Sequence, residues 1–479
     1  MASSFVGRRP QLQLLQAIRY DTPEAHLTAI YGRRRIGKTR LVKEAYKNAD
    51  LLHFEGLEGV GSREQKRHFL KTLSRHSGKQ AHQLASMADW EDLLVLLAEY
   101  VAERPCVIFF DEFQWMAAER SDLIGKLKYV WDNYFKEAGH VHLILCGSVS
   151  SFLVKKVIRS RALYGRIDNI IHLGPLEFAD ARTGFFANRS VLEALEYYLV
   201  FGGVPKYLEM YAANRSVRLN ISNLCFKPGA YFLEEFERLF ASHFGKVHHY
   251  RSVVEFLAGR AFASREEIAK HTGLHSGGRI SGFLENLVLA GFIESYGSIH
   301  SPRATRLKRY RIADPYLRFY FRFICPLVGR IARAQEGVPL PQALPEKRYG
   351  IFLGLAFESF CSQHAHSIAK TLGFSAVAYE CGSWFKRRGV SAGAQIDLLY
   401  KRADNVITLC EIKHRSKVTK EVIAEVEAKV EAMGVRNSVT IEKVLISALP
   451  PGKELYDAAY FVRILTAEDF ATQRTVDPH

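Results

Sequence analysis

The sequence predicts an α/β protein made of several domains. Short apolar strands alternate with amphipathic helical stretches at both ends of the chain, and helical patterns fill the middle. At roughly 150 residues per domain, 479 residues is also enough for about three domains. We therefore expect a helix-covered parallel sheet at the N-terminus and a second α/β domain at the C-terminus.

Residues 1–185 are expected to form the first α/β domain. Helical patterns separate its strands, which favours a parallel sheet. The predicted strands are His26–Tyr31, Asp50–Glu55, Cys106–Phe110, His140–Cys146 and Ile167–Leu173. Residues 186–249 are helical in pattern, with a turn at Gly202–Pro205, and are expected to form a helical lid.

Residues 250–312 have the order of elements typical of a winged helix, three helices and then a β-hairpin. Ser264 and Glu267 form a capping box before the second helix. The predicted hairpin pairs Gly291–Tyr296 with Arg306–Ile312. Residues 313–345 form a basic, aromatic connector. The aromatic side chains of 316–323 are expected to be core, with a base-stacking platform as the alternative.

Residues 346–479 are expected to form the last α/β domain. It begins with a helix and continues with a hairpin of Gln395–Tyr400 and Val406–Lys413. A helix over Thr419–Met433 and a strand over Val444–Ser447 follow.

The chain is strongly basic, with 66 Lys and Arg against 50 Asp and Glu and a net charge of +16. This favours an anionic partner, nucleic acid before an acidic membrane surface. The sequence has neither a signal-peptide pattern nor a membrane-length apolar run, and its seven cysteines form no Cys-x-x-Cys pair. We expect reduced thiols, no structural zinc, no membrane association and a cytoplasmic protein.

A phosphate-binding loop follows the first predicted strand. Residues 32–39 fit Gly-x4-Gly-Lys-Thr and lead into a helical segment, which is the context that this motif requires. Lys38 is expected to contact the β- and γ-phosphates of ATP, and Thr39 to offer its hydroxyl to Mg²⁺. The nucleotide-binding residues are expected to be Gly32, Arg33, Arg34, Arg35, Ile36, Gly37, Lys38, Thr39 and Arg40.

A second strand supplies the carboxylates that such a loop needs. Cys106–Phe110 is followed by Asp111 and Glu112. Asp111 is expected to hold Mg²⁺, and Glu112 to orient or deprotonate the attacking water. Ser148, after the strand His142–Cys146, is a candidate sensor of the γ-phosphate, with an ordinary turn serine as the alternative.

These motifs resemble the prokaryotic, especially archaeal, AAA+-type ATPase family of the signal-transducing STAND class. Phe5–Arg8, Phe110–Gln114, Cys146–Ser148 and Leu163–Arg166 carry the resemblance together with the phosphate loop. The resemblance implies that Arg166 acts on the γ-phosphate, with a structural salt bridge as the alternative. It also implies that Gly203–Pro205 is the Gly-x-Pro signature of the lid, with Pro205 at the nucleotide, and that the protein forms a nucleotide-dependent homo-oligomer.

A second group of charged residues lies in the last domain. Alternation along the strand places Glu411 and Lys413 on one face, where Asp397 of the partner strand can meet them. Glu358 shares a helix face with Ile351 and Leu355 and is expected to be buried there. Three carboxylates and a lysine are suited to phosphodiester hydrolysis with Mg²⁺ or Mn²⁺. Asp397 and Glu411 are expected to be metal ligands, and Glu358 a third ligand or a support behind the ligands. Lys413 is expected to stabilise or orient the metal-activated hydroxide. The alternative is a solvated hairpin with an ion pair.

This second group resembles the PD-(D/E)xK restriction-nuclease-like fold, with Glu358, Asp397, Glu411 and Lys413 at the family's catalytic positions. Gly382–Phe385 adds to the resemblance. The resemblance implies a restriction-endonuclease-like α/β domain and a metal-dependent nuclease.

Basic side chains around the winged helix and before Asp397 are candidate DNA contacts. They are Arg279, Arg303, Arg306, Lys308, Arg309, Arg311 and Lys386–Arg388. The alternative for the winged helix is a lid or a protein interface. The sequence thus favours an ATP-dependent, DNA-acting nuclease. Two other hypotheses are a nucleotide-controlled DNA- or protein-binding switch, as in origin-recognition ATPases, and a translocase, for which no further helicase motif is found.

Overall fold

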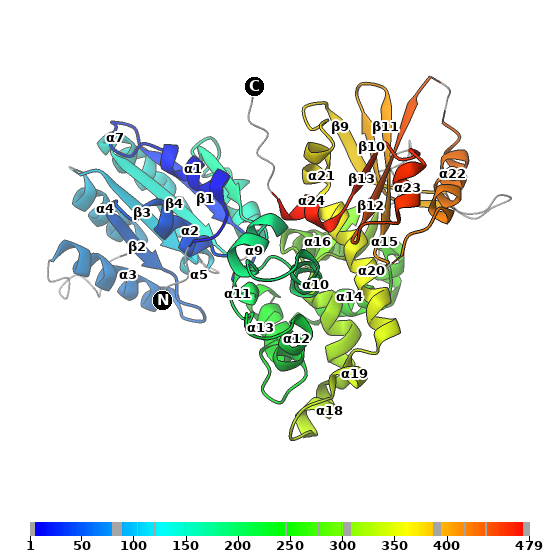
Figure 1. Cartoon of the computed structure of the whole chain (residues 1–479). Coiled ribbons are helices and arrows are strands. Elements are labelled where there is room, and N and C mark those ends of the chain that lie inside the picture. The colour runs from blue at the N-terminus through cyan, green and yellow to red at the C-terminus, as the bar shows by residue number, and fades with distance from the viewer. Residues whose placement is uncertain are drawn as a thin grey trace. The chain divides into compact units, whose positions relative to one another are not determined.

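The computed structural model describes residues 5–78, 89–102, 104–117, 121–148, 150–244, 247–274, 278–297, 299, 308–386, 394–415, 417–435 and 438–472 (Figure 1). The chain divides into two compact units, residues 1–176 with 204–206, and residues 177–203 with 207–479. In the part of the chain that the structure describes, no helix is both long and apolar enough to span a membrane.

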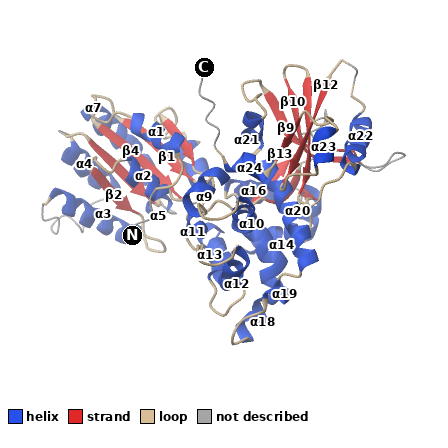
Figure 2. Cartoon of the chain, viewed as in Figure 1, coloured by secondary structure: helices blue, strands red, loops and turns tan. Residues whose placement is uncertain are grey.

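The first unit is built on a five-stranded parallel sheet in the order β2-β3-β4-β1-β5. Its strands are β1 (His26–Tyr31), β2 (Leu51–Glu55), β3 (Cys106–Asp111), β4 (Val141–Gly147) and β5 (Asn169–His172). Each strand lies within two residues of its predicted bounds, and the predicted parallel sheet is confirmed. Every residue of β3 and β4 is buried, as expected for strands whose sheet carries helices on both faces (Figure 2).

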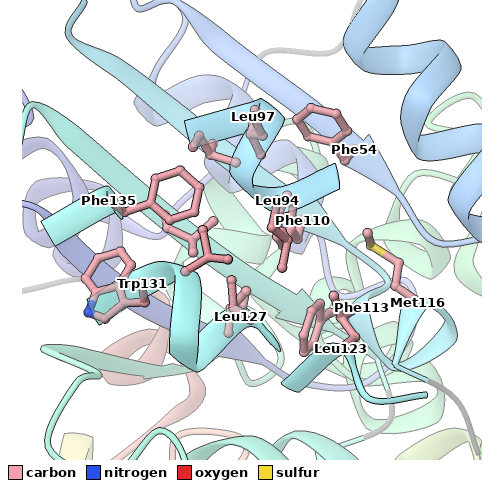
Figure 3. Packing of buried hydrophobic residues seen from close by; sticks show 14 of the residues in the cluster. Phe54, Leu94, Leu97, Phe110, Phe113, Met116, Leu123, Leu127, Trp131 and Phe135 are labelled. Carbon is pink, nitrogen blue, oxygen red and sulfur yellow. The ribbon is translucent and has the colours of Figure 1, made fainter. Parts of the chain in front are cut away.

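The helices of the first unit are α1 (Arg9–Ala17), α2 (Lys38–Ala45), α3 (Ser62–Ser77), α4 (Trp90–Val101), α5 (Phe113–Met116), α6 (Leu123–Val130), α7 (Lys136–Ala138) and α8 (Ser150–Phe152). Large apolar side chains of α3, α4, α5 and α6 pack in the core of this unit together with residues of the sheet. Figure 3 shows Phe110 of β3 among Leu94 and Leu97 of α4 and Leu127 of α6, all fully buried. Burial of such a side chain stabilises the fold by about 1.5–3 kcal/mol. This packing fixes the end of β3, where Asp111 lies.

The second unit begins with helices, as predicted for residues 186–249. They are α9 (Phe178–Phe185), α10 (Val191–Phe201), α12 (Val217–Cys225) and α13 (Tyr231–Phe244). The short helix α11 (Pro205–Leu208) begins in residues assigned to the first unit and ends in the second. The aromatic residues of α17 (Pro315–Phe319) and the turn after it pack against these helices. Tyr316 and Phe319 are fully buried, and the Tyr316 hydroxyl donates to the carbonyl oxygen of Phe232 at 2.9 Å. The core interpretation of this segment is therefore confirmed.

Three helices and a small antiparallel sheet follow in the order predicted for a winged helix. The helices are α14 (His248–Ala258), α15 (Arg265–Thr272) and α16 (Gly278–Leu289), and the sheet has the order β6 (Ala263–Ser264), β8 (Arg309–Ile312), β7 (Ile293–Tyr296). The capping box of Ser264 and Glu267 is present. Arg303 and Arg306 of the predicted wing lie outside the described residues.

The last part of the second unit contains a mixed five-stranded sheet in the order β13-β12-β11-β10-β9. The strands are β9 (Tyr379–Lys386), β10 (Ala394–Arg402), β11 (Val406–Lys413), β12 (Thr440–Ser447) and β13 (Arg463–Leu465). The antiparallel pairing of β10 with β11 confirms the predicted hairpin, whereas β11, β12 and β13 are parallel. The helices are α18 (Val328–Arg333), α19 (Leu340–Ala343), α20 (Glu346–Gln363), α21 (Ala365–Thr371), α22 (Glu421–Met433), α23 (Lys453–Asp457) and α24 (Ala467–Ala471).

Candidate functional site

The phosphate loop connects the end of β1 to the start of α2. Gly37 has a φ of 92°, a conformation that favours glycine. At Gly32, a Cβ would lie 2.2 Å from the carbonyl oxygen of Leu173, so a side chain is excluded there. Lys38 is buried, and its Nζ donates to the carbonyl oxygens of Gly32 and Arg33, each at 3.1 Å. The ammonium is therefore held within the turn of the loop, at the start of a helix, where phosphate groups are favoured.

The strand order brings the predicted Mg²⁺ ligands to this loop. β1 lies between β4 and β5, and the carboxyl ends of β1 and β3 lie at one edge of the parallel sheet. The Thr39 hydroxyl donates to Oδ2 of Asp111 at 2.6 Å, and Nε2 of His53 on β2 lies 3.6 Å from the same oxygen. Burial would raise the pKa of Asp111, but His53 and Thr39 outweigh it and hold the pKa below its usual value. Asp111 is thus kept ionised, as a metal ligand must be.

The next carboxylate, Glu112, is fixed by two polar neighbours. The Ser148 hydroxyl donates to Oε2 of Glu112 at 2.6 Å, and Nε2 of Gln114 donates to the same oxygen. Nε2 of Gln114 also lies 3.1 Å from the Ser148 hydroxyl oxygen. Glu112 has a φ of 47°, which is uncommon for a residue with a side chain and occurs often at functional sites. The predicted residues Glu112 and Ser148 therefore meet beside Asp111, at the edge of the sheet that carries the loop.

Other predicted nucleotide contacts lie along the loop. Ile36 is buried, and Arg34 forms an ion pair with Glu58 at 3.2 Å. Pro205 belongs to the first unit, and its Cγ would lie 3.9 Å from a Cβ placed on Gly37. The structure thus places Pro205 beside the loop.

Arg166 is held by an ion pair in this structure. Its Nε and Nη2 donate to the two carboxylate oxygens of Asp132 at 2.6 and 2.8 Å, and Nη1 donates to the carbonyl oxygens of Ala162 and Tyr164. The side-chain hydrogen bond with Arg166 lowers the pKa of Asp132 to about 2. This is the salt-bridge alternative that the sequence left open, and an action of Arg166 on the γ-phosphate stays a prediction.

The residues around the loop fit Mg²⁺ and ATP. A hydroxyl and an ionised carboxylate, 2.6 Å apart, are the oxygen donors that Mg²⁺ prefers. The held ammonium of Lys38 and the start of α2 complement phosphate charge.

The predicted carboxylate group of the C-terminal sheet is brought together in part. The register between β10 and β9 shifts between Ile396 and Leu399, so Asp397 lies at an irregularity, a feature that often re-aims side chains near functional sites. Nε2 of Gln395 donates to Oδ1 of Asp397 at 2.7 Å. Glu411 is buried and lies on the neighbouring strand β11.

Glu358 is close enough to the other carboxylates to respond to their charge. Burial, followed by the negative charge of Asp397, raises the pKa of Glu358 to about 7. Glu411 raises it further, and the positive charges of Arg311 and Lys413 oppose the increase. The four predicted residues therefore form one electrostatic group.

The prediction that Ile351 and Leu355 form a buried apolar helix face around Glu358 was wrong. Ile351 is 53% exposed and Leu355 is 50% exposed. The buried side of α20 instead carries Phe357 and Phe360, and the Phe360 ring packs against Phe178 of α9 and Tyr198 of α10. Glu358 lies at the boundary of this buried side and is half-buried.

The acidic group is neutralised by lysines. Lys413 Nζ lies 2.9 Å from Oε1 of Glu411, and Lys429 Nζ of α22 lies 2.5 Å from Oε2. Lys413 also lies 2.5 Å from Oε2 of Glu425. Within the described ranges, no group of three or more His, Cys, Asp or Glu side chains is arranged to hold a metal ion. The residues have the donor chemistry for Mg²⁺ or Mn²⁺, but in this arrangement they do not fit a bound cation.

The predicted DNA contacts differ in their exposure. Arg279 and Lys308 are exposed. The guanidinium group of Arg309, by contrast, contacts two aromatic rings: its Cζ lies 3.8 Å from the ring centre of Phe262 and 3.4 Å from that of Phe385. Arg311 forms an ion pair with Glu294 on β7. Both arginines make contacts within the fold in this structure, and a DNA contact by either one stays a prediction.

Other predicted contacts lie outside the described residues. They are Arg303, Arg306, Arg387 and Arg388.

Four residues at or near the predicted sites were not assigned a role from the sequence. They are Arg8, His53, Gln114 and Lys429. Arg8 donates to the carbonyl oxygen of Ile36 at 3.3 Å and so supports the loop. Arg8 and Gln114 lie within motifs that carried the family resemblance, and that was an available signal. His53 and Lys429 meet their partners only through strand order and helix docking.

This fold and loop define an ATPase domain of the P-loop type. Residues 5–211 match the model of a family described as an ATPase domain predominantly from Archaea. Over these residues the chain is similar to that family's ATPase domain. An uncharacterized protein of Methanocaldococcus jannaschii is 26% identical over 404 residues, covering 82% of this chain and 84% of the relative.

Similar solved structures include a Walker-type ATPase of Pyrococcus abyssi, with 18% identity and a TM-score of 0.46 over 66% of this chain and 96% of that one. The ORC2 protein of Aeropyrum pernix has 15% identity and a TM-score of 0.43, covering 76% of this chain and 96% of that one. A STAND protein of Pyrococcus horikoshii with a tetratricopeptide repeat sensor has 16% identity and a TM-score of 0.31, covering 77% of this chain and 48% of that one.

Proposed function

We propose that the chain is an ATP-hydrolysing enzyme that acts on DNA, and that its C-terminal domain cleaves phosphodiester bonds with a divalent cation. One observation supports the second part most: Glu358, Asp397, Glu411 and Lys413, from a helix and two strands, form one electrostatic group. A domain that only binds a partner has no need of three such carboxylates beside a lysine, because gathering like charges destabilises a fold.

At the first site, each residue has a defined part in ATP hydrolysis. Lys38 would bind the β- and γ-phosphates, and Thr39 and Asp111 would hold Mg²⁺, which neutralises phosphate charge. Glu112, fixed by Ser148, orients the attacking water and accepts its proton as the water oxygen bonds to the γ-phosphorus. The bond that breaks is the phosphoanhydride bond that joins the γ-phosphate of ATP to the β-phosphate. ADP and inorganic phosphate are the products.

DNA is proposed as the substrate of the second site because of charge. The chain carries a net charge of +16, and Arg279 and Lys308 are exposed in the region predicted as a winged helix. Binding through such side chains would weaken steeply with added salt and depend little on base sequence.

The test is a cleavage assay. Supercoiled plasmid, linear duplex, single-stranded DNA and RNA are incubated with the full chain and Mg²⁺ or Mn²⁺, with and without ATP. We expect cleavage of DNA by the wild type and its loss in Asp397→Asn. Asp404→Asn is the matched control, since Asp404 lies in the turn of the same hairpin and pairs with Arg402. Absence of cleavage by the wild type under every condition, or cleavage that survives in Asp397→Asn, would contradict the nuclease proposal.

A second candidate is a nucleotide-controlled switch that binds DNA or a protein and cleaves nothing. The pairing of Glu411 with two lysines favours it, because a site neutralised in this way is stable without a cation. This candidate predicts salt-dependent DNA binding with intact DNA recovered at every cation concentration. The cleavage assay therefore separates the two candidates.

A further inference from the structure

Helix α22 places two oppositely charged side chains, Glu425 and Lys429, next to the carboxylate group. Val422 and Val426 are buried in the core of the C-terminal sheet, and this docks the helix. Glu425 and Lys429 are four residues apart and so lie on one side of the helix. Both reach β11, where Glu425 pairs with Lys413 and Lys429 pairs with Glu411. Two helix residues and two strand residues thus form a row of ion pairs that runs from Glu425 through Lys413 and Glu411 to Lys429.

In this set Lys413 is shared between Glu411 and Glu425, and Lys429 supplies the second ammonium group at Glu411. The side chain of Glu411 is 4% exposed, and a carboxylate buried to this degree needs a compensating charge. Lys413, from the same strand, already lies 2.9 Å from Oε1. Lys429 then holds the other oxygen, Oε2, at 2.5 Å. Both oxygens that would face a metal ion are therefore taken by ammonium groups.

The two lysines differ in how readily they can leave. Lys413 is fixed on a central strand of the sheet, and its side chain is 12% exposed. Lys413 is also held by Glu425 of α22, at 2.5 Å. Lys429 is more exposed, at 20%, and its flexible four-carbon stem begins on a surface helix. Lys429 is therefore the group that can move into water when a cation arrives.

From this geometry we infer that Lys429 is a built-in competitor of the divalent cation, holding Glu411 in an inactive arrangement until the ion displaces it. The inference rests on the proposed phosphodiesterase function and deepens it. It explains why suitable donors are present while no metal-binding group is assembled among the described residues. In this role Lys429 is a positioning residue, since it acts through Glu411.

The test measures cation binding without cleavage. Mn²⁺ is titrated into the full chain without nucleotide, and free Mn²⁺ is followed by electron paramagnetic resonance. The variants are Lys429→Met, Lys429→Arg, Asp397→Asn and the double variant Lys429→Met/Asp397→Asn. Lys443→Met is the matched control, because Lys443 pairs with Glu427 of the same helix. Circular dichroism checks that each variant is folded.

We expect Lys429→Met to lower the dissociation constant of an Asp397-dependent Mn²⁺ site about tenfold or more, as for the loss of a competing charge at a close ion pair. Lys429→Arg, which keeps the charge, and Lys443→Met should bind Mn²⁺ as the wild type does. Equal affinity in the wild type and Lys429→Met would overturn the inference and leave the proposed nuclease standing. Absence of Asp397-dependent binding in both proteins would overturn the proposed metal site itself, and with it the inference.

Discussion

Replacement of Glu112 by glutamine tests the mechanism proposed for the ATPase site. Glutamine keeps the size and shape of the side chain, and its amide oxygen can still accept the hydrogen bond that Ser148 donates to Oε2 at 2.6 Å. It cannot accept a proton from water. A positioned general base contributes about 10²–10⁴-fold to a rate, or about 3–5 kcal/mol of barrier. We expect kcat for ATP hydrolysis to fall by this factor.

Nucleotide binding should change little in this variant. Lys38 and Thr39, which are assigned to the phosphates and Mg²⁺, bond to Gly32, Arg33 and Asp111 rather than to Glu112. Phosphate release gives kcat, and titration with a non-hydrolysable ATP analogue gives affinity.

Ser148→Ala is the graded control for this prediction. It removes one hydrogen bond to a charged carboxylate, worth about 1.5–3 kcal/mol, so kcat should fall about 10- to 150-fold. The assignment of Glu112 would be refuted if Glu112→Gln kept kcat within about threefold of the wild type. A rise in KM at unchanged kcat would also refute it, since that result assigns Glu112 to binding.

Three further predictions follow from the structure. Lys38→Ala should abolish binding of the ATP analogue in calorimetry, and unchanged affinity would disprove the phosphate-loop assignment. Asp132→Asn weakens the ion pair with Arg166, so the thermal midpoint of the unit that contains it should fall by about 2–4 °C for each kcal/mol lost; an unchanged midpoint would show that the pair contributes nothing. Burial and the charge of Asp397 raise the pKa of Glu358 from 4.5 to about 7 in the folded protein. Between pH 4.5 and pH 7 the folded protein therefore binds more protons than the unfolded chain. The free energy of unfolding should fall by up to about 3 kcal/mol as the pH rises over this range. Urea unfolding in EDTA at pH 5 and pH 8 checks this, and Glu358→Gln should remove the fall; parallel changes in wild type and variant would contradict it.

Local sequence patterns predict the first site well. A glycine-rich loop between a strand and a helix, and a strand that ends in Asp111 and Glu112, each determine their own geometry over a few residues. The meeting of Thr39 with Asp111 then follows from the parallel sheet. His53 could not be predicted in the same way, because its contact depends on β2 lying next to β3, and strand order is set by packing of the whole sheet.

The C-terminal site is less predictable for the same physical reason. Alternation along β11 correctly places Glu411 and Lys413 on one face, where they form an ion pair. Helical spacing alone, however, does not say which side of α20 packs on the sheet, and Ile351 and Leu355 proved to be exposed. Lys429 is the one lysine of α22, a helix that otherwise carries four glutamates. Its meeting with Glu411 depends on how that helix docks on the sheet, which the local sequence pattern does not give.

The central claim is that one chain carries two separate sites, one for ATP hydrolysis and one for DNA cleavage. Its most direct test measures both activities in the same reactions, for the wild type, Lys38→Ala and Asp397→Asn. The account predicts that Lys38→Ala loses ATP hydrolysis, and that Asp397→Asn loses cleavage while it hydrolyses ATP at the wild-type rate. Loss of ATP hydrolysis in Asp397→Asn, or cleavage that persists in this variant, would contradict the assignment of two distinct sites.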